Sequence, residues 1–376
     1  MIAAFLTGLR EMEIREAPEP KLSGARDVLL RVERVGVCGS DVHYYTSGRI
    51  GSAVVQFPFI VGHECAGTVI EVGPEVSRFR PGQRVAIDPL VSCGECDQCL
   101  AGRPHTCRHQ RFLGLPGQLD GSLVEYLVMP EDSCFAIPDS LTLDQAVVVE
   151  PLSIGLYAQR MSCLKSGTKI AILGSGPIGL CALLACRAAA DCTAYLTDLI
   201  PERLKMASQC GAAWTGNPRI SDVVKVIRDA EPLGVDLVFE CAGQQEAIDQ
   251  GIELLKPGGT LLIVGIPEVD RISFPIHTLR RKELAILNVR RQNQCMADAI
   301  AMVASGKVNV NPLMTHHFPL KETKAAFDLV AGYRDGVIKA LIHIPERALS
   351  FRATRPFSRN NLRGSPVGKC PARSYN

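Results

Sequence analysis

The sequence predicts an α/β protein in which a β-rich unit precedes a doubly wound parallel sheet. Two observations carry this prediction. The first 150 residues contain short β-like runs such as "DVLLRVERVGVCG" and "AGTVIEVG", which glycine and proline separate. From about residue 156 onward, short apolar strands such as "KIAIL" and "VDLVFEC" alternate with segments of helical length, which is typical of βαβ units.

Composition and charge narrow the class of protein further. The formal net charge is only +2, so there is no overall electrostatic attraction to nucleic acid or to a membrane surface. No apolar run reaches the roughly 20 residues that a membrane helix needs, and the N-terminus does not resemble a signal peptide. The 15 cysteines are an odd number and mostly stand singly in apolar stretches, which favours reduced thiols and a cytoplasmic protein.

We expect three parts along the chain. Residues 1–156 form the β-rich domain, which residues 293–346 complete with a helix, "CMADAIAMVASG", and a final strand, "VIKALIHI". Residues 157–292 form the parallel-sheet domain. Residues 347–376 contain seven basic and no acidic side chains with few apolar ones, which is typical of a disordered basic tail.

A glycine-rich turn opens the parallel-sheet part. Gly174, Gly176 and Gly179 follow a strand and begin an apolar helix, and Asp198 stands at the end of the next strand. This context indicates a dinucleotide site in which the glycines admit the pyrophosphate and Asp198 accepts both ribose hydroxyls, favouring NAD over NADP. The alternative is that these glycines serve only the turn. Arg203 either touches the adenosine ribose or lies on a solvated helix surface. Further expected cofactor contacts are Pro177, Ile178, Val264, Gly265 and Ile266.

Four cysteines lie within fifteen residues, in "CGECDQCLAGRPHTC". Their spacing indicates a tetrahedral zinc ion held by four thiolates, which leaves no coordination position for a substrate. We therefore expect a structural zinc site at Cys93, Cys96, Cys99 and Cys107.

Three other segments provide candidates for a second, open zinc site. They contain Cys38 in "GVCGSDVHYY", His63 and Glu64 in "GHECAGTV", and Glu150 in "VVVEPLSIG". A mixed set of thiol, imidazole and carboxylate leaves a position for water or substrate, as catalytic zinc requires. Taken singly, Cys38 could be a core thiol, His63 a loop histidine, and Glu150 the cap of a helix that begins near Pro151.

These segments, the four-cysteine cluster and "GSGPIG" occur together and in order over residues 1 to about 344. The chain thereby resembles zinc-dependent medium-chain dehydrogenases, and specifically their polyol (sorbitol, xylitol, L-arabinitol) branch. The resemblance implies a GroES-like catalytic domain, a Rossmann domain and a homotetramer. It implies that Cys38, His63 and Glu64 bind the catalytic zinc, and that Glu150 binds this ion or its water.

The resemblance also implies a reaction, in which a secondary hydroxyl of a polyol is oxidised to a ketone and hydride passes to NAD. Ser40 would take the proton and His43 would relay it, while Tyr44 and Arg290 would contact the substrate. The resemblance also implies that Arg290 contacts the cofactor. Tyr44 could instead be a packing aromatic. Alternatives are a related enzyme that acts on another secondary alcohol, such as the hydroxyl of threonine, and a non-catalytic protein that binds NAD and zinc. Where the family often has an aromatic residue, this chain has Arg291, which bears on the substrate.

Overall fold

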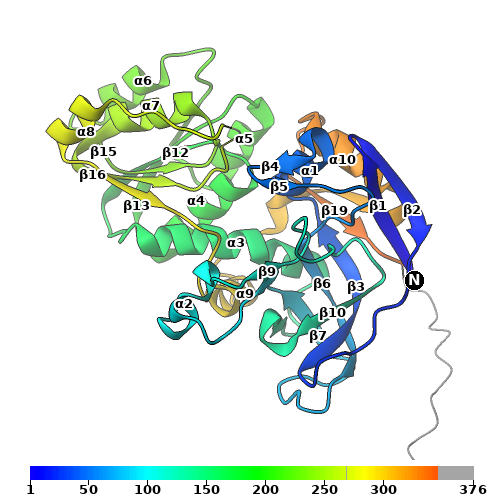
Figure 1. Ribbon diagram of the computed structural model, residues 1–376. Helices are drawn as coiled ribbons and strands as arrows, with labels where there is room; N and C mark the ends of the chain where they lie inside the picture. The colour runs from blue at the N-terminus through cyan, green and yellow to red at the C-terminus, as the bar shows by residue number, and fades with distance from the viewer. Residues whose placement is uncertain (268, 346–376) are drawn as a thin grey trace, which may run out of the picture. The chain divides into compact units, whose positions relative to one another are not determined.

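The structure, a computed structural model, describes residues 1–267 and 269–345. Its strands belong chiefly to two sheets, one drawn from both ends of the chain and one from the middle (Figure 1). The expected basic tail, residues 347–376, lies outside the described residues. Among the described helices, none is both long enough and apolar enough to cross a membrane.

The seven-stranded sheet joins the two ends of the described chain. Its strand β3 (Asp27–Gly36) pairs with β6 (Glu64–Val72) on one side and with β19 (Lys339–His343) on the other. The C-terminal segment therefore completes the β-rich unit, although the domain boundaries themselves stay a prediction. The other strands of this sheet are β7 (Arg84–Ile87), β10 (Tyr126–Pro130), β11 (Cys134–Ala136) and β18 (Met314–Pro319).

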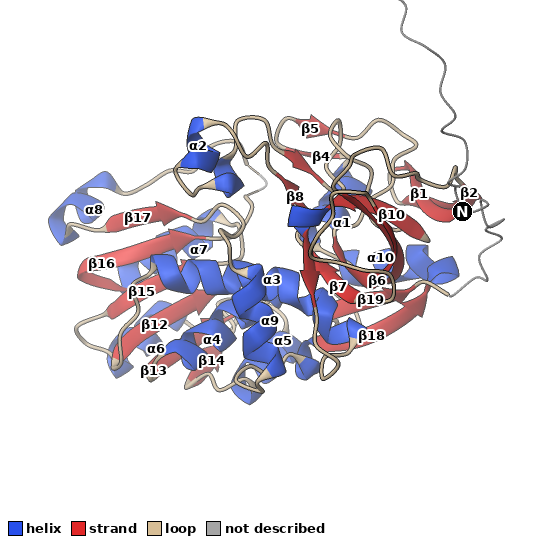
Figure 2. Cartoon of the chain, turned by 90° about the horizontal axis from the view of Figure 1, so that it is seen from below, coloured by secondary structure: helices blue, strands red, loops and turns tan. Residues whose placement is uncertain are grey.

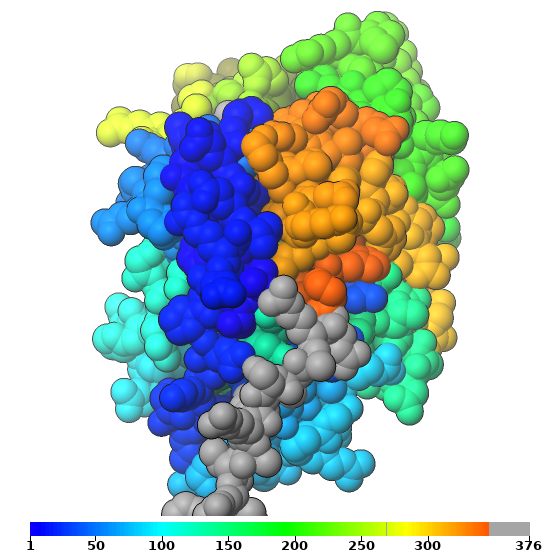
Figure 3. Space-filling model, turned by 90° about the vertical axis from the view of Figure 1, so that its right-hand side faces the viewer, coloured from blue at the N-terminus to red at the C-terminus, as the bar shows by residue number. Residues whose placement is uncertain are grey.

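An N-terminal hairpin lies beside a late helix. The hairpin consists of β1 (Ile2–Gly8) and β2 (Glu11–Glu16), and β2 adjoins α10 (Thr323–Ala331). In Figure 3 the blue N-terminal surface lies beside the orange surface of the later segments. From α1 (Gly39–Ser47), the Tyr45 hydroxyl donates to Asp328 at 2.7 Å, which ties α1 to α10 as well. The remaining short elements here are β4 (Arg49–Ile50), β5 (Ala53–Val54), β8 (Leu90–Val91), β9 (Arg111–Phe112), α2 (Asp97–Leu100) and the 3₁₀ helices η1 (Pro104–Thr106), η3 (Asn311–Leu313) and η4 (Leu320–Glu322).

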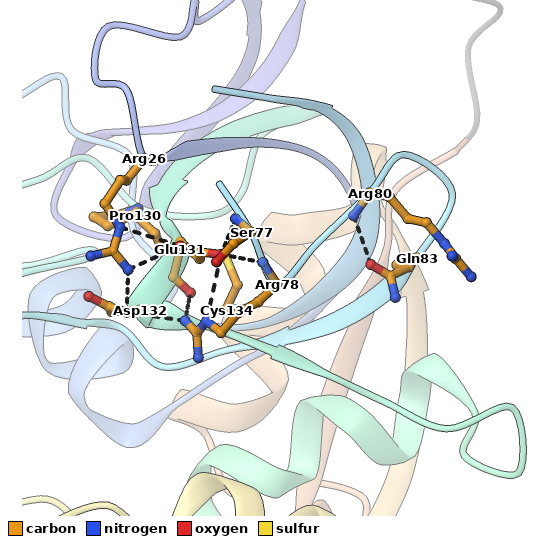
Figure 4. Close-up of polar contacts among 9 residues, drawn as sticks. All are labelled: Arg26, Ser77, Arg78, Arg80, Gln83, Pro130, Glu131, Asp132 and Cys134. Atoms are coloured by element: carbon orange, nitrogen blue, oxygen red, sulfur yellow. Dashed lines mark hydrogen bonds and ion pairs between the residues drawn. The ribbon is translucent and has the colours of Figure 1, made fainter. Parts of the chain in front are cut away.

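A buried carboxylate fastens one corner of the β-rich unit (Figure 4). Glu131 begins the 3₁₀ helix η2 (Glu131–Ser133) and accepts backbone N–H groups from Ser77 at 2.8 Å and Arg78 at 2.6 Å. The Arg26 guanidinium donates to the other carboxylate oxygen at 3.0 Å. Burial alone would raise the pKa of Glu131, but these donors lower it below its usual value. Glu131 therefore links three segments of this corner, because its donors come from the segments that contain Arg26 and Ser77–Arg78.

The parallel sheet has the strand order β14-β13-β12-β15-β16-β17, and every adjacent pair is parallel. This is the doubly wound order, in which ligands bind where the strand order reverses, between β12 and β15. The strands are β12 (Thr168–Leu173), β13 (Cys192–Thr197), β14 (Trp214–Gly216), β15 (Val235–Glu240), β16 (Leu255–Ile263) and β17 (Ala285–Asn288). Its helices are α4 (Pro177–Ala189), α5 (Pro201–Gln209), α6 (Val223–Ala230), α7 (Gln245–Leu254) and α8 (Ile276–Lys282), and Figure 2 shows them beside the sheet.

Helix α3 (Leu143–Met161) runs from the β-rich unit to the parallel-sheet part of the chain. Thr142 caps it through a reciprocal pair of hydrogen bonds with Gln145, so the helix does not begin near Pro151 and Glu150 is not its cap. Helices α4 and α9 (Met296–Ala304) pack against α3. Gly155 permits the close approach of α4, because a Cβ atom there would lie 2.5 Å from the Cys181 carbonyl carbon.

Candidate functional site

The four cysteines of the loop around α2 converge as expected. Their Sγ atoms lie 3.5 Å (Cys93–Cys107), 3.6 Å (Cys96–Cys99), 3.9 Å (Cys96–Cys107) and 4.0 Å (Cys93–Cys99) apart. A tetrahedron with metal–sulfur bonds of about 2.3 Å has sulfur–sulfur edges of about 3.8 Å. All four thiols are free, so the cluster has the dimensions of a four-thiolate zinc site and forms no disulfide.

A second cluster brings together Cys38, His63 and Glu64, whose ligand atoms all lie within 4.8 Å of one another. Strand pairing creates it, since β3 and β6 pair Gly36 with Glu64, and Cys38 lies two residues after the end of β3. Gly36 is needed at this point, because a Cβ atom there would lie 2.3 Å from a carboxylate oxygen of Glu64. With three ligand types and no fourth side chain in the group, the cluster fits an open metal site.

Asp41, which the sequence reasoning missed, holds this cluster in place. Its fully buried carboxylate accepts the backbone N–H groups of Cys38 and Gly62, and lies 3.2 Å from His63 Nδ1. A hydrogen bond donated by Nδ1 to this carboxylate would fix the tautomer that presents Nε2 to a metal. The signal was present in "CGSD", where the aspartate stands at the third position of a helix that Cys38 caps.

Lys339 on β19 was also missed. Its Nζ atom lies 2.7 Å from both carboxylate oxygens of Glu64, and it donates to the Val37 carbonyl at 3.2 Å. Both side chains of this pair are almost fully buried. Burial alone would lower the pKa of Lys339, but the Glu64 carboxylate raises it well above its usual value. The Lys339 ammonium group therefore already contacts both carboxylate oxygens of Glu64.

Glu150 lies on α3 outside the group of three ligands. It is buried, and its Oε2 atom has no hydrogen-bond partner among the described residues. Burial raises the pKa of Glu150 to about 7, with the nearby His63 opposing the rise and Glu64 adding to it. A buried carboxylate oxygen without a partner is costly, so this atom fits a metal ion or a water molecule bound to one.

The expected catalytic side chains of α1 differ in their surroundings. Ser40 and His43 are both partly exposed near the start of the helix that Cys38 caps. Tyr44 is buried within the apolar core of the β-rich unit, and burial raises its pKa to about 12, with Asp41 adding to the rise. The packing interpretation of Tyr44 therefore gains support, while its role as a substrate contact stays a prediction.

The glycine-rich turn has the close packing that a phosphate cradle needs. Gly174 adopts a φ of 101°, and a Cβ atom on Gly179 would lie 1.9 Å from the Gly174 carbonyl oxygen. Gly176 caps α4, and Pro177 and Ile178 form its first turn. The turn leads from β12 into the helix at the edge where the strand order reverses, which is where a dinucleotide pyrophosphate binds in this fold.

Asp198 stands at the end of β13 beside this turn. Its carboxylate accepts the backbone N–H groups of Ser175 at 2.8 Å and Ile200 at 2.9 Å. The Arg203 guanidinium lies 3.9 Å from Asp198 and 3.4 Å from the position of a Cβ atom on Gly176. The Arg203 side chain is only 13 % exposed, so it does not lie on a solvated helix surface. Both side chains are thus placed for a ribose or phosphate group at the turn.

The loop after β16 carries three of the expected cofactor contacts. Backbone N–H groups of Val264 and Gly265 donate to the Glu240 carbonyl at 2.8 and 2.9 Å, and Ile266 is exposed. Glu240 itself was missed: its buried carboxylate ends β15 and accepts the N–H groups of Ala242 and Gly243. It braces the two loops that follow β15 and β16 at the carboxyl edge of the sheet.

A third group of possible ligands, Asp144, His317 and His343, lies elsewhere on the β-rich unit. Arg34 donates to Asp144 at 2.6 Å, and the two imidazole rings share a hydrogen bond of 2.8 Å. These contacts satisfy the three side chains without an ion, so we assign no metal to this group.

The fold and the clusters define a nucleotide-binding protein with one closed and one open metal-ligand set. Two family models match it: the alcohol dehydrogenase GroES-like domain at residues 24–139 and the zinc-binding dehydrogenase domain at residues 177–305. The chain belongs to the zinc-dependent medium-chain dehydrogenases, in their polyol dehydrogenase branch.

Individual relatives agree with this membership. The chain is 38 % identical to a sorbitol dehydrogenase of Bacillus subtilis, covering 91 % of this chain and 97 % of that protein. It is 37 % identical to a sorbitol dehydrogenase of Rattus norvegicus, covering 87 % of this chain and 92 % of that protein. Among solved structures, an alcohol dehydrogenase from Thermus sp. ATN1 is similar with a TM-score of 0.85 at 27 % identity, covering 92 % of this chain and all of that one (100 %).

Proposed function

We propose that the protein oxidises a secondary hydroxyl group of a polyol to a ketone, with NAD as the hydride acceptor and zinc as the catalytic metal. One observation carries the proposal: the open cluster of Cys38, His63 and Glu64 occurs in the same chain as a complete dinucleotide turn. The relatives named sorbitol dehydrogenase support a polyol as the substrate class.

The residues fit two zinc ions with different tasks. Cys93, Cys96, Cys99 and Cys107 would hold a structural ion. Cys38, His63 and Glu64 would hold the catalytic ion, and Glu150 would bind that ion or its water, which explains its unpartnered oxygen. Zinc at this site supplies a Lewis acid that acidifies the substrate hydroxyl, and NAD supplies the hydride acceptor.

The chain's own groups orient the substrate and move the proton. Ser40 accepts the proton from the substrate hydroxyl and His43 passes it outward, since both are partly exposed on α1 next to Cys38. Asp41 keeps His63 in the tautomer that presents Nε2 to the metal. Arg290, which is exposed and carries no ion pair among the described residues, is available to a substrate or cofactor oxygen, and Tyr44 is the second candidate contact for a substrate hydroxyl.

The assembly and compartment are part of the proposal. We propose a homotetramer in the cytoplasm. The free thiols of every described cysteine support a reducing compartment, because disulfides form and persist in oxidising ones. Light scattering of the full chain measures the assembly state.

The proposed reaction predicts NADH production from polyols. Initial rates with NAD across four- to six-carbon polyols, threonine and simple primary alcohols measure it by absorbance. We expect polyols to give the highest kcat/KM. A preference for threonine would move the substrate assignment to the amino-alcohol relatives, and no NADH from any alcohol by the zinc-loaded protein would contradict the proposal.

Asp198 is expected to determine the choice of NAD over NADP. Asp198→Ala removes charged hydrogen bonds to the ribose and the repulsion of a 2′-phosphate. We expect the affinity for NAD to fall about tenfold to a hundredfold, because about 1.5–3 kcal/mol of binding free energy is lost. The difference between the affinities for NAD and NADP should therefore become smaller. Titration of both cofactors by fluorescence measures the change, with Glu202→Ala, an exposed carboxylate on α5, as the matched control. A preference for NADP in the unmodified protein would refute this role.

A further inference from the structure

Arg291 lies close to the candidate metal cluster although it binds none of its members. Its guanidinium carbon lies 3.7 Å from the centroid of the Phe112 ring. The Phe112 ring in turn lies 5.5 Å from the ring of His63. A single aromatic ring therefore separates a cation from a proposed zinc ligand, and the carboxyl groups of Glu150 and Asp88 act on this guanidinium from longer range.

No carboxylate of the described residues lies within ion-pair distance of this guanidinium. Its one hydrogen bond there is a long one, 3.4 Å from Nη1 to Gln110 Oε1. The nearby Asp88 is already used, since it accepts the Gln292 amide at 2.6 Å and the backbone N–H of Leu90. Burial and the charge of Arg290 lower the pKa of Arg291 to about 9, so it remains a cation at neutral pH. A partly buried cation without an adjacent anion is less favourable than one whose charge a bound anion compensates.

Arg290 adds a second positive charge next to Arg291. It is exposed, forms no ion pair with any described residue, and lies near enough to Arg291 to influence its charge. Two neighbouring guanidinium groups offer planar forks that match a carboxylate or a phosphate, which accept two parallel hydrogen bonds. A neutral polyol offers neither guanidinium group a negative charge.

We infer that Arg291, together with Arg290, forms an anion subsite, and that the physiological substrate is a polyol with a carboxylate or phosphate group at one end. The inference rests on the proposed function, because it names the substrate class of the same site. The anionic end would contact the two arginines while the hydroxyl to be oxidised faces the cluster of Cys38, His63 and Glu64. The competing explanation is that Arg291 only offsets the buried charges of Glu150 and Asp88 at longer range.

Matched substrates and variants separate these explanations. The substrates are a hexitol, the six-carbon polyhydroxy carboxylate of the same configuration and the hexitol monophosphate. The variants are Arg291→Met and Arg291→Gln, and the control is Arg111→Met on β9, which removes an exposed charge directly before Phe112. In the unmodified enzyme we expect one anionic substrate to exceed the hexitol in kcat/KM by about tenfold or more, and the better anion identifies the group.

The selectivity is the ratio of kcat/KM for that anionic substrate to kcat/KM for the hexitol. We expect this ratio to fall about tenfold to a hundredfold in both Arg291 variants. In the control Arg111→Met it should stay unchanged. A merely structural Arg291 would lower both values together. Calorimetric titration of the zinc-loaded protein with the anionic compound, without NAD, provides a readout independent of turnover, and its affinity should fall in parallel.

Different experimental results would contradict the anion subsite and the proposed function. Equal or better turnover of the neutral hexitol, with unchanged ratios in the Arg291 variants, would overturn the anion subsite and leave polyol oxidation intact. Absence of turnover for all three substrates, with no anion binding by calorimetry, would overturn both.

Discussion

Replacing Cys38 or His63 by alanine is expected to lower kcat/KM for the polyol by about 10³-fold or more while the protein stays folded. The reason is that these residues would hold the Lewis acid, whose transition-state stabilisation amounts to several kcal/mol at about 1.4 kcal/mol per tenfold. Zinc analysis by mass spectrometry should show the loss of one of two ions per chain. Circular dichroism of Cys38→Ala should change little, since Cys38 lies between β3 and α1 and is already partly exposed.

The same substitution in the four-cysteine cluster should give a different result. Cys96→Ala is expected to lose the other ion and to destabilise its loop, which has short elements and few apolar contacts to hold it. Cys163→Ala, at an exposed free thiol, is the matched control and should keep both ions and full activity. Near-normal turnover of Cys38→Ala would show that the catalytic metal is held elsewhere.

Lys339→Met is expected to cost about 3–5 kcal/mol in the free energy of unfolding of the metal-free protein. The substitution leaves the Glu64 carboxylate buried without its ammonium partner, which contacts both oxygens at 2.7 Å. Urea unfolding in the presence of a chelator measures the loss. With zinc restored, the loss should be smaller, because a bound cation next to Glu64 replaces part of the missing charge.

A double-mutant cycle tests whether this pair causes the loss. Adding Glu64→Gln to Lys339→Met removes the unpaired charge and should recover part of the stability, whereas Lys339→Arg keeps a positive charge and should lose less. If Lys339→Met unfolds within about 1 kcal/mol of the unmodified protein, the ion pair is not a major contributor to this site.

Features encoded within short stretches were predictable from the sequence. The glycine turn, the acidic end of the next strand and the four-cysteine loop each lie within a few tens of residues, so local backbone geometry brings their parts together. The doubly wound sheet was also predictable, since alternating apolar strands and helices leave few other topologies. The same local logic could have located the start of α3, because "TLDQ" is a capping box, but the proline in the helix suggested a later beginning.

What the sequence by itself determined is therefore the class of protein, the type of cofactor site and the identity of the candidate metal ligands. Only the tertiary structure decided which side chains contact these sites from distant parts of the chain. Lys339 reaches Glu64 because β19 pairs with β3 beside Cys38, and Arg291 comes to lie over Phe112 although 179 positions separate them in the chain. No local pattern encodes such contacts, because side chains from distant segments become neighbours only when strands pair and the core closes. Burial then changes their energetics, lowering the pKa of Arg291, while the Glu64 carboxylate raises that of buried Lys339.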